Sequence, residues 1–521
     1  MTPFLQFRVW LRRGPSGERV GAGLASLVLV ALVAWAAIPL DGGGGPSNGA
    51  VSVGAGTASG DEAGSSETGT AQGETPTGEA GGGPGTAGSG RATSGSTAVT
   101  QRQGAAAGPA GAAGATADRC AGLRATDQGV TPTEIFVAVS IIDLAGEIGN
   151  ATFGLRSADE YAEISQAYIS GINEEGGAAC RRLRIKTYKV NTLDQNQRQA
   201  KCLEIIEDKP FAVIDLAGYA DPAARACFVN AKLPYQGARP ANEDEAASAF
   251  PYMYSPHVSH DRAMRTWVFE AAARRVFDAQ NGFRKLGLLV NECYPRARAE
   301  LRQHLNRVGV RDDQISEFTM AGCVGLAPPN EIAQAVAQHR GDDVSHVFFG
   351  TLNGQNYVRQ ADALQWHPEY LISDLDNTAT GAVQSQWPDG FDGALAITGR
   401  RSGERISGSE HPLVTHCNEW LKKANLAPSQ TAADDSPLEL CDEFRLFAAA
   451  ANAAGANVVR TTLVNGLATV GRFEGATFGI GIYDRPGKVF GTDFVRATRW
   501  HVDCKCFKVL DPEMRLGRLD P

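Results

Sequence analysis

Strand-like and helix-like segments alternate along residues 134–373, and this alternation limits the fold more than any other feature of the chain. Strands are expected at 134–140, 183–190, 211–218, 285–291, 315–320, 344–350 and 370–373. Between the first two strands, Ser157 and Glu160 form a capping-box pattern that opens a helix. Strands that alternate with helices build parallel sheets through right-handed crossovers. Because the pattern restarts after a junction near residue 250, it predicts an α/β protein with parallel sheets in two similar, Rossmann-like lobes.

The composition changes sharply before this region. Gly accounts for 60 of the 521 residues, and the stretch 41–118 is rich in Gly, Ala, Ser and Thr but has no Leu, Ile, Met or aromatic residue. Such a segment buries too little apolar surface to offset chain entropy, so we expect a disordered linker. The folded part, a single globular region, is expected at 119–521.

The apolar run 20–40 is long enough to cross a bilayer once. The basic tail 1–19 precedes it, which predicts a cytoplasmic N-terminus. We therefore expect a single-pass cell-membrane protein whose folded domain lies on the extracytoplasmic side. A cleaved signal segment is the alternative, because Ala34 and Ala36 offer a small-x-small cleavage pattern.

The net charge and the absence of certain motifs limit the classes of function that this chain can have. A net charge of −9 with no long basic run argues against nucleic acid as a partner, since phosphate binding needs concentrated Lys and Arg. The sequence has no Gly-x-Ser-x-Gly, phosphate-binding loop or His-Glu-x-x-His motif. We expect no enzyme activity and no cofactor, although an enzyme on a similar α/β scaffold remains an alternative, because catalytic triads assemble from residues distant in sequence. His257 and His260 fall at the expected lobe crossover, where a structural role is favoured, and we expect no metal site.

The 10 cysteines indicate disulfides in an exported chain. Three pairs are expected: Cys202–Cys227, Cys293–Cys323 and Cys417–Cys441. The remaining four leave alternatives open. Cys504 and Cys506 could close a small ring with each other, or one of them could pair with Cys120 or Cys180.

Candidate ligand-binding residues follow the carboxyl ends of the expected strands, where ligands bind in parallel α/β sheets. They are Asp143, Glu147, Tyr219, Ala220, Ala238, Arg239, Tyr294, Asn353 and Asp376. Tyr219 and Tyr294 are favoured, because aromatic loop residues at a cleft often form the wall of a ligand site. Helix N-termini at the same edge supply free N–H groups for a carboxylate.

The order of these elements resembles the type I periplasmic binding fold, in particular the branched-chain amino-acid (Leu/Ile/Val) binding protein family. The segment 137–177, which ends in INEEGG, is similar to the family's opening strand, ligand loop and first helix. Residues 198–218 resemble its second helix and the strand after it, and residues 487–509 its closing strand pair. The resemblance covers roughly 130–510.

The resemblance implies discontinuous lobes with a ligand between them and closure by a hinge motion. Lobe one would comprise 130–253 plus 390–470, and lobe two 254–389 plus 471–521. The family holds a ligand carboxylate with lobe-one hydroxyl and N–H groups, and a ligand ammonium with a lobe-two acid, near which Asp376 is placed. This chain differs at 216–222, which lacks the hydroxyl-rich segment, and at Arg239, which favours a more acidic ligand.

The resemblance also implies the function. We expect an extracytoplasmic solute-binding protein that captures a small polar ligand, such as an amino acid, an amide or a related compound. Its partner would be the membrane permease of an ABC-type transporter. The alternative is a membrane-tethered sensory or structural binding module that has lost transport function.

Overall fold

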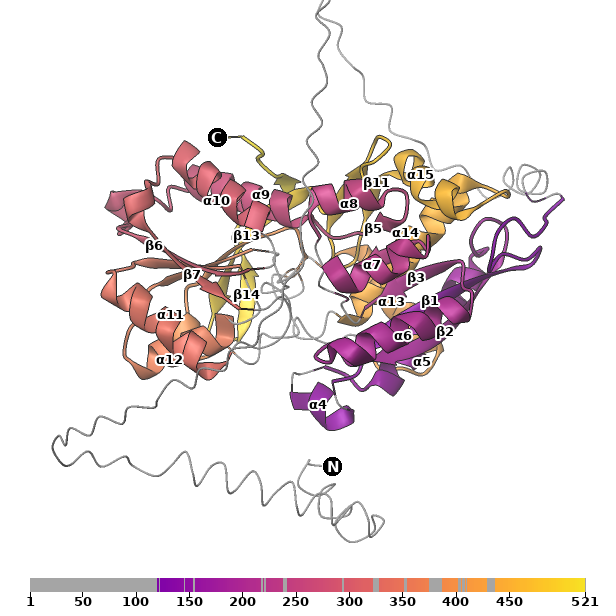
Figure 1. The fold of residues 1–521 in the computed structure, drawn as a ribbon, viewed down its shortest axis with the longest axis horizontal. Helices are drawn as coiled ribbons and strands as arrows, with labels where there is room; N and C mark the ends of the chain where they lie inside the picture. Colours follow the sequence, from indigo (N-terminus) through magenta and orange to yellow (C-terminus); the bar gives the residue numbers. More distant parts are fainter. Residues whose placement is uncertain are drawn as a thin grey trace, which may run out of the picture. The chain divides into compact units, whose positions relative to one another are not determined.

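The computed structural model describes fifteen stretches of the chain (Figure 1). They are residues 120, 122–144, 146–152, 155–216, 219, 222–237, 241–292, 295–321, 328–350, 354–373, 387–401, 404, 408, 410–428 and 436–520. The tail 1–19, the apolar run 20–40 and the linker 41–118 lie outside them. Within the described residues, no helix combines the length and apolarity that a membrane crossing needs.

Five parallel strands form the first sheet, in the order β2-β1-β3-β4-β5. The strands are β1 (Glu134–Ile142), β2 (Arg182–Val190), β3 (Ala212–Asp215), β4 (Tyr235–Gly237) and β5 (Met253–Tyr254). The helices between them are α4 (Glu147–Thr152), α5 (Ala158–Glu174), α6 (Gln195–Glu207), α7 (Pro222–Asn230) and α8 (Glu243–Ala249). Because β2 and β3 flank β1 on opposite sides, right-handed crossovers place α5 on one face and α6 and α7 on the other.

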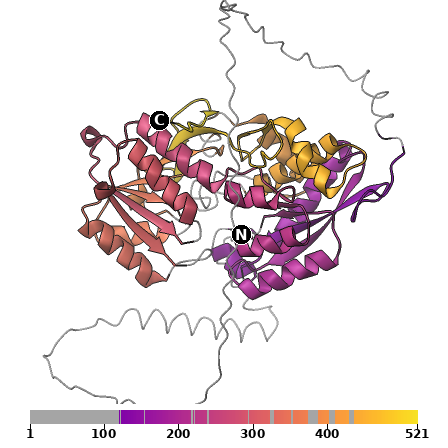
Figure 2. The same cartoon turned by 45° about the horizontal axis from the view of Figure 1, so that its top comes forward.

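Helix α5 begins where the sequence predicts. The Ser157 hydroxyl accepts a hydrogen bond from the Glu160 N–H at 3.2 Å, and the Glu160 carboxylate accepts one from the Ser157 N–H at 2.9 Å. The helix packs against two later helices, α13 (Pro412–Lys423) and α14 (Ser436–Ala454). Gly171 permits this contact, since a Cβ there would stand 2.5 Å from the Trp420 ring. Figure 2 shows α14 beside α15 (Arg460–Val470), in amber, as their contacts require.

The second sheet has eight strands in the order β14-β13-β10-β9-β8-β6-β7, with β15 paired to β13. Its strands are β6 (Leu286–Asn291), β7 (Ile315–Met320), β8 (His346–Phe349), β9 (Glu369–Ile372), β10 (Leu395–Thr398), β13 (Phe494–His501), β14 (Cys506–Val509) and β15 (Arg515–Leu516). Strands β6 to β10 run parallel, whereas β13 joins β10, β14 and β15 antiparallel.

Helices and short 3-10 turns complete this second lobe. They are α9 (His260–Ala273), η1 (Ala279–Asn281), α10 (Pro295–Arg307), η2 (Asp312–Gln314), α11 (Pro329–Gly341), α12 (Gly354–Ala363) and η5 (Asp389–Phe391). The pair α9 and α10 packs together, as does the pair α11 and α12. Two buried clusters result. In one, the ring centres of Trp267 and Phe348 are 3.8 Å apart; in the other, the stacked rings of Trp387 and Phe391 have centres 3.7 Å apart.

Two segments lie in a different lobe from the one expected. Strand β10 pairs with β9 and β13 of the second sheet, although 390–470 was expected in lobe one. The antiparallel pair β11 (Gly471–Glu474) and β12 (Ile480–Tyr483) was expected in lobe two, yet its Phe473 and Tyr483 belong to the hydrophobic core of the first sheet. The reason is that β11 follows α15 directly and packs against it.

The structure contains the disulfides Cys202–Cys227 and Cys417–Cys441, two of the expected pairs. Among the alternatives left open, it has Cys120–Cys180 and Cys504–Cys506. The third expected pair, Cys293–Cys323, lies outside the described residues.

The start of the folded domain is fastened at the amino edge of the first sheet. Cys120 is bonded to Cys180, which lies between α5 and β2. The buried Arg181 guanidinium donates to the carbonyl groups of Thr131, Ala179 and Arg124 at 2.7, 2.8 and 2.9 Å. These bonds hold residues 120–133 before β1 begins.

Candidate functional site

The carboxyl edge of the first sheet is organised around Asp215, the last residue of β3. Its buried carboxylate accepts hydrogen bonds from the Ser140 hydroxyl of β1, from the Tyr235 hydroxyl of β4 at 2.5 Å, and from the Tyr219 N–H at 2.8 Å. Burial, together with the Asp215 charge, raises the pKa of Tyr235, so its hydroxyl stays protonated as a donor. Three neighbouring strands, β1, β3 and β4, and the loop after β3 are thus fixed relative to one another.

The loop after β1 is held by Asn150, which the sequence did not single out. Its side-chain oxygen accepts from the Leu144 N–H at 2.7 Å, and its amide donates to the carbonyl groups of Ile142 and Arg156 at 3.1 and 2.8 Å. The partly buried Asp143 accepts from the Gly146 N–H at 2.9 Å. An asparagine early in a short helix carries no sequence signal for such a role, because its partners come from the fold.

Tyr219, a predicted ligand residue, is buried in the described structure. Its ring packs edge-on against Phe228 of α7 at 4.9 Å, and its hydroxyl donates to the Arg198 carbonyl of α6 at 3.4 Å. Burial raises its pKa. The side chain therefore joins α6 to α7, and its role in ligand binding stays a prediction.

Most of the other predicted ligand-binding residues lie outside the part of the chain that the structure describes. Glu147 is exposed at the first residue of α4. Six residues lie outside the described part of the chain: Ala220, Ala238, Arg239, Tyr294, Asn353 and Asp376. Three helices begin within two residues of three of them: α7 at Pro222 follows Ala220, α10 at Pro295 follows Tyr294, and α12 at Gly354 follows Asn353. Their first turns carry free backbone N–H groups at the carboxyl edges of both sheets.

The chain passes between the lobes three times, from β5 to α9, from β10 to α13 and from β12 to β13, and the first and last of these segments are bonded tightly together. The Ser255 carbonyl accepts from the Gly491 N–H at 3.1 Å and from the Tyr483 hydroxyl at 2.7 Å. The Thr492 hydroxyl donates to the Pro256 carbonyl at 2.8 Å. Gly491 is required at this contact, because a Cβ would lie 2.5 Å from the Pro256 oxygen.

A buried charge network joins the crossing segment that contains Arg400 to the one that contains His257. The Arg400 guanidinium donates to Glu439 of α14 at 2.5 Å and to the His257 ring at 2.8 Å, and it lies 4.9 Å from the centre of the Phe478 ring. The side chains of Arg400, Glu439 and His257 are all buried. The three crossings therefore meet at a single cross-linked locus.

A second ionic cluster joins α8 of the first lobe to α9 and α10 of the second. Arg296 pairs with Asp244 at 2.6 Å across the surface, and the Glu243 N–H donates to the Asp261 carboxylate at 3.0 Å. Asp261 is only 8% exposed. Burial is the main cause that raises the pKa of Asp261 to about 6, and the nearby Glu243 charge adds to it.

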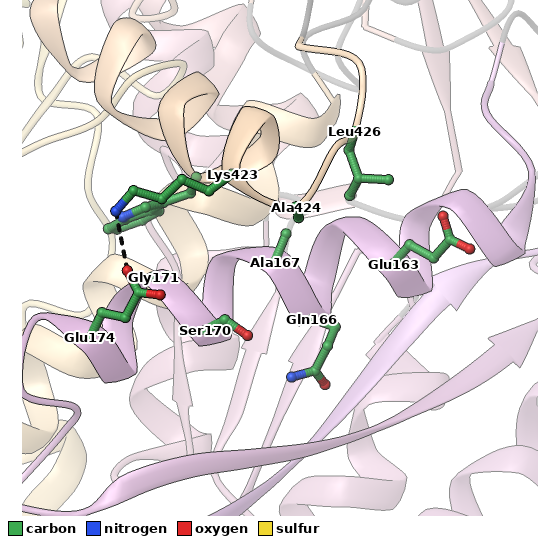
Figure 3. Close-up of a pocket in the computed structure, with 10 residues that line it drawn as sticks. Glu163, Gln166, Ala167, Ser170, Gly171, Glu174, Lys423, Ala424 and Leu426 are labelled. Atoms are coloured by element: carbon green, nitrogen blue, oxygen red, sulfur yellow. Dashed lines mark hydrogen bonds and ion pairs between the residues drawn. The ribbon is translucent and has the colours of Figure 1, made fainter.

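A groove between α5 and the end of α13 lies away from these strand ends. It encloses about 550 Å³ and is lined by Ala167, Gly171 and Trp420 among others. Figure 3 shows Ala167 beneath Ala424, with the 3.1 Å ion pair between Glu174 and Lys423 at one end. Because this groove opens between helices that cover one face of the sheet, we do not assign the ligand site to it.

Comparison with known proteins shows the fold. No family model matches the sequence, and no curated protein matches it. A branched-chain amino acid ABC transporter protein from Thermus thermophilus with bound valine is 13% identical with a TM-score of 0.56, covering 74% of this chain and 97% of that one.

Two further solved structures are similar over a comparable length. A solute-binding protein of an ABC transporter from Rhodopseudomonas palustris BisB5, in complex with 3,4-dihydroxy benzoic acid, is 13% identical with a TM-score of 0.55, covering 74% of this chain and 99% of that one. A fatty acid ABC transporter substrate-binding protein from Thermomonospora curvata is 13% identical with a TM-score of 0.53, covering 76% and 96%. At such identities the likeness is one of fold: this chain has the α/β fold of these solute-binding proteins, as its resemblance to the type I periplasmic binding fold implies.

Proposed function

We propose that the protein is an extracytoplasmic solute-binding protein that captures a small, carboxylate-bearing ligand between its two lobes and delivers it to an ABC-type transporter. The observation that carries the proposal is the single locus where the crossing segments meet, between two sheets that each have their own core. A locus of this kind supports a hinge, because the two lobes can rotate about it while their cores stay packed. A ligand that binds the closed state more tightly then shifts the population toward closure.

The ligand class follows from two lines of support. Valine, dihydroxybenzoic acid and fatty acids, the compounds named for the similar structures, all carry a carboxylate. In this chain, Arg239 is a predicted site residue whose planar guanidinium suits a carboxylate, and the first turn of α7, which follows the predicted residue Ala220, supplies N–H groups. Asp376 would accept the ammonium group if the ligand is an amino acid.

The test is a ligand screen on the full chain by thermal shift, followed by calorimetry. Aliphatic amino acids, hydroxybenzoates and fatty acids are compared with their neutral amides. A ligand at 100 times its Kd should stabilise the fold by about 2.7 kcal/mol. Arg239→Gln should weaken binding at least about tenfold, the loss of one charged hydrogen-bond pair. The matched control is Arg182→Gln at the exposed start of β2, which should bind normally.

Three results would count against this function. They are a chain that no carboxylate stabilises, amides that bind as well as acids, and a stable protein partner in place of any small ligand. The last result would support the sensory or structural module.

A further inference from the structure

The turn between β13 and β14 carries a disulfide whose two sulfur atoms differ in accessibility. Cys504 and Cys506 are two positions apart in sequence, with Cα atoms 5.2 Å apart. Cys504 is exposed, whereas Cys506 is 2% exposed at the start of β14. An external thiolate can therefore reach the Cys504 sulfur, and the Cys506 sulfur is the leaving group.

The fold does not depend on this bond as it does on the others. The stabilisation that a disulfide provides grows with the logarithm of the loop that it closes. Cys504–Cys506 encloses one residue, whereas the other described disulfides span 60, 25 and 24 positions. The β13–β14 hairpin is already held by its register and by the buried rings of Trp500 and Phe507, 5.2 Å apart.

The surroundings favour the reduced, ionised form of the pair. Lys505 lies between the two cysteines, and Lys508 follows on β14. Two acids lie at the same turn: Asp503, which pairs with Lys508 at 3.3 Å, and Asp392, whose carboxylate accepts from the Val502 N–H at 3.0 Å. His501 is the direct cross-strand partner of Cys506. Nearby cations lower the pKa of a thiol, and stabilising the thiolate makes a disulfide a stronger oxidant.

We propose that Cys504–Cys506 is a thiol–disulfide exchange site that oxidises an accessible dithiol, a function separate from solute capture. One thiolate of the dithiol attacks the Cys504 sulfur, the Cys504–Cys506 bond breaks, and its electron pair leaves on the Cys506 sulfur, which then takes up a proton. In the mixed disulfide, the second thiol of the dithiol then attacks the first sulfur of that dithiol, the one bonded to Cys504, and releases the Cys504 thiolate. The dithiol becomes a disulfide, and the protein pair gains two electrons.

The first experiment uses dithiothreitol as the dithiol probe on the oxidised full chain. Samples are quenched with N-ethylmaleimide at intervals, and labelled peptides are quantified by mass spectrometry. Cys504 and Cys506 should be labelled at least about tenfold faster than Cys202 and Cys227, because exchange follows access to the sulfur. Equal rates for the two pairs would overturn the proposal.

Two single variants test which sulfur is attacked. In Cys506→Ser the exposed Cys504 should form a mixed disulfide with oxidised glutathione about tenfold faster than Cys506 does in Cys504→Ser. The double variant Cys504→Ala/Cys506→Ala should keep the wild-type melting temperature and lose the fast oxidation of dithiothreitol. The proposal fails if the two single variants react alike, or if the double variant does not fold, since the bond would then be structural.

Discussion

The close packing of the segments that cross between the lobes predicts that replacing Gly491 even by alanine causes a large loss of stability. A Cβ at this position would lie 2.5 Å from the Pro256 carbonyl oxygen and 2.6 Å from the Tyr483 hydroxyl. Forcing an extra methyl group into such a contact costs about 1–3 kcal/mol. If the hydroxyl moves, its hydrogen bond to the Ser255 carbonyl is lost as well, about 0.5–1.5 kcal/mol. The free energy of unfolding should therefore fall by about 1.5–4.5 kcal/mol, the sum of these two costs.

A double-mutant cycle separates the two causes. Tyr483→Phe alone should cost about 0.5–1.5 kcal/mol, because the Ser255 carbonyl keeps its bond from the Gly491 N–H. In that background Gly491→Ala should cost about 1 kcal/mol less than in the wild type, since one of its two steric conflicts is gone. Unfolding in urea, followed by tryptophan fluorescence and circular dichroism, gives all three values.

The matched control is Gly341→Ala at the exposed end of α11, where a Cβ meets nothing within 4 Å. Its effect should stay within about 1 kcal/mol. If Gly491→Ala destabilises the protein no more than Gly341→Ala, then the close packing of the crossing segments does not hold them together, and the reasoning is refuted.

Three further predictions concern buried charge and covalent links. The pKa of Asp261 is raised to about 6 in the folded state. The contribution of this group to stability is therefore most favourable below about pH 4 and declines as the pH rises to about 6, so that the fold is about 3 kcal/mol less stable at pH 8 than at pH 4. Asp261→Asn should recover most of that at pH 8 and nothing at pH 4; a variant less stable than wild type at pH 8 in urea titrations would contradict this. Arg400→Met leaves a buried carboxylate unpaired and should cost about 3–5 kcal/mol, against less than about 1 kcal/mol for Arg296→Gln at the exposed pair, and similar melting temperatures would exclude the difference. Cys202→Ala/Cys227→Ala opens a loop of 25 positions and should cost about 3.5 kcal/mol in urea unfolding, whereas a loss near zero would contradict the chain-entropy estimate.

Local signals in the sequence predicted much of the fold. The Ser157–Glu160 capping box places the start of a helix, because the chemistry of a helix terminus involves only neighbouring residues. The Cys202–Cys227 pair follows from two helices that flank one strand, so the topology alone brings them near each other.

Features that depend on distant partners could not be predicted. His257 and Arg400 are 143 positions apart, and neither residue carries a pattern that points to the other. Strand β10 was placed in lobe one by analogy with the family, and a strand of four residues does not itself specify which sheet it joins. Tyr219 follows its strand as predicted, but whether its ring faces a ligand or Phe228 is decided by packing.

The covalent link from Cys120 to Cys180 determines where mechanical load enters the folded domain. Tension on the preceding chain divides at Cys120 and passes through the sulfur–sulfur bond into the turn ahead of β2, which bypasses the segment 122–133 that Arg181 holds by hydrogen bonds. Strand β1, which lies in the interior of its sheet between β2 and β3, is thereby shielded from being peeled away. The force arrives at the edge of the sheet opposite the carboxyl ends of its strands, away from the loops that follow those strands.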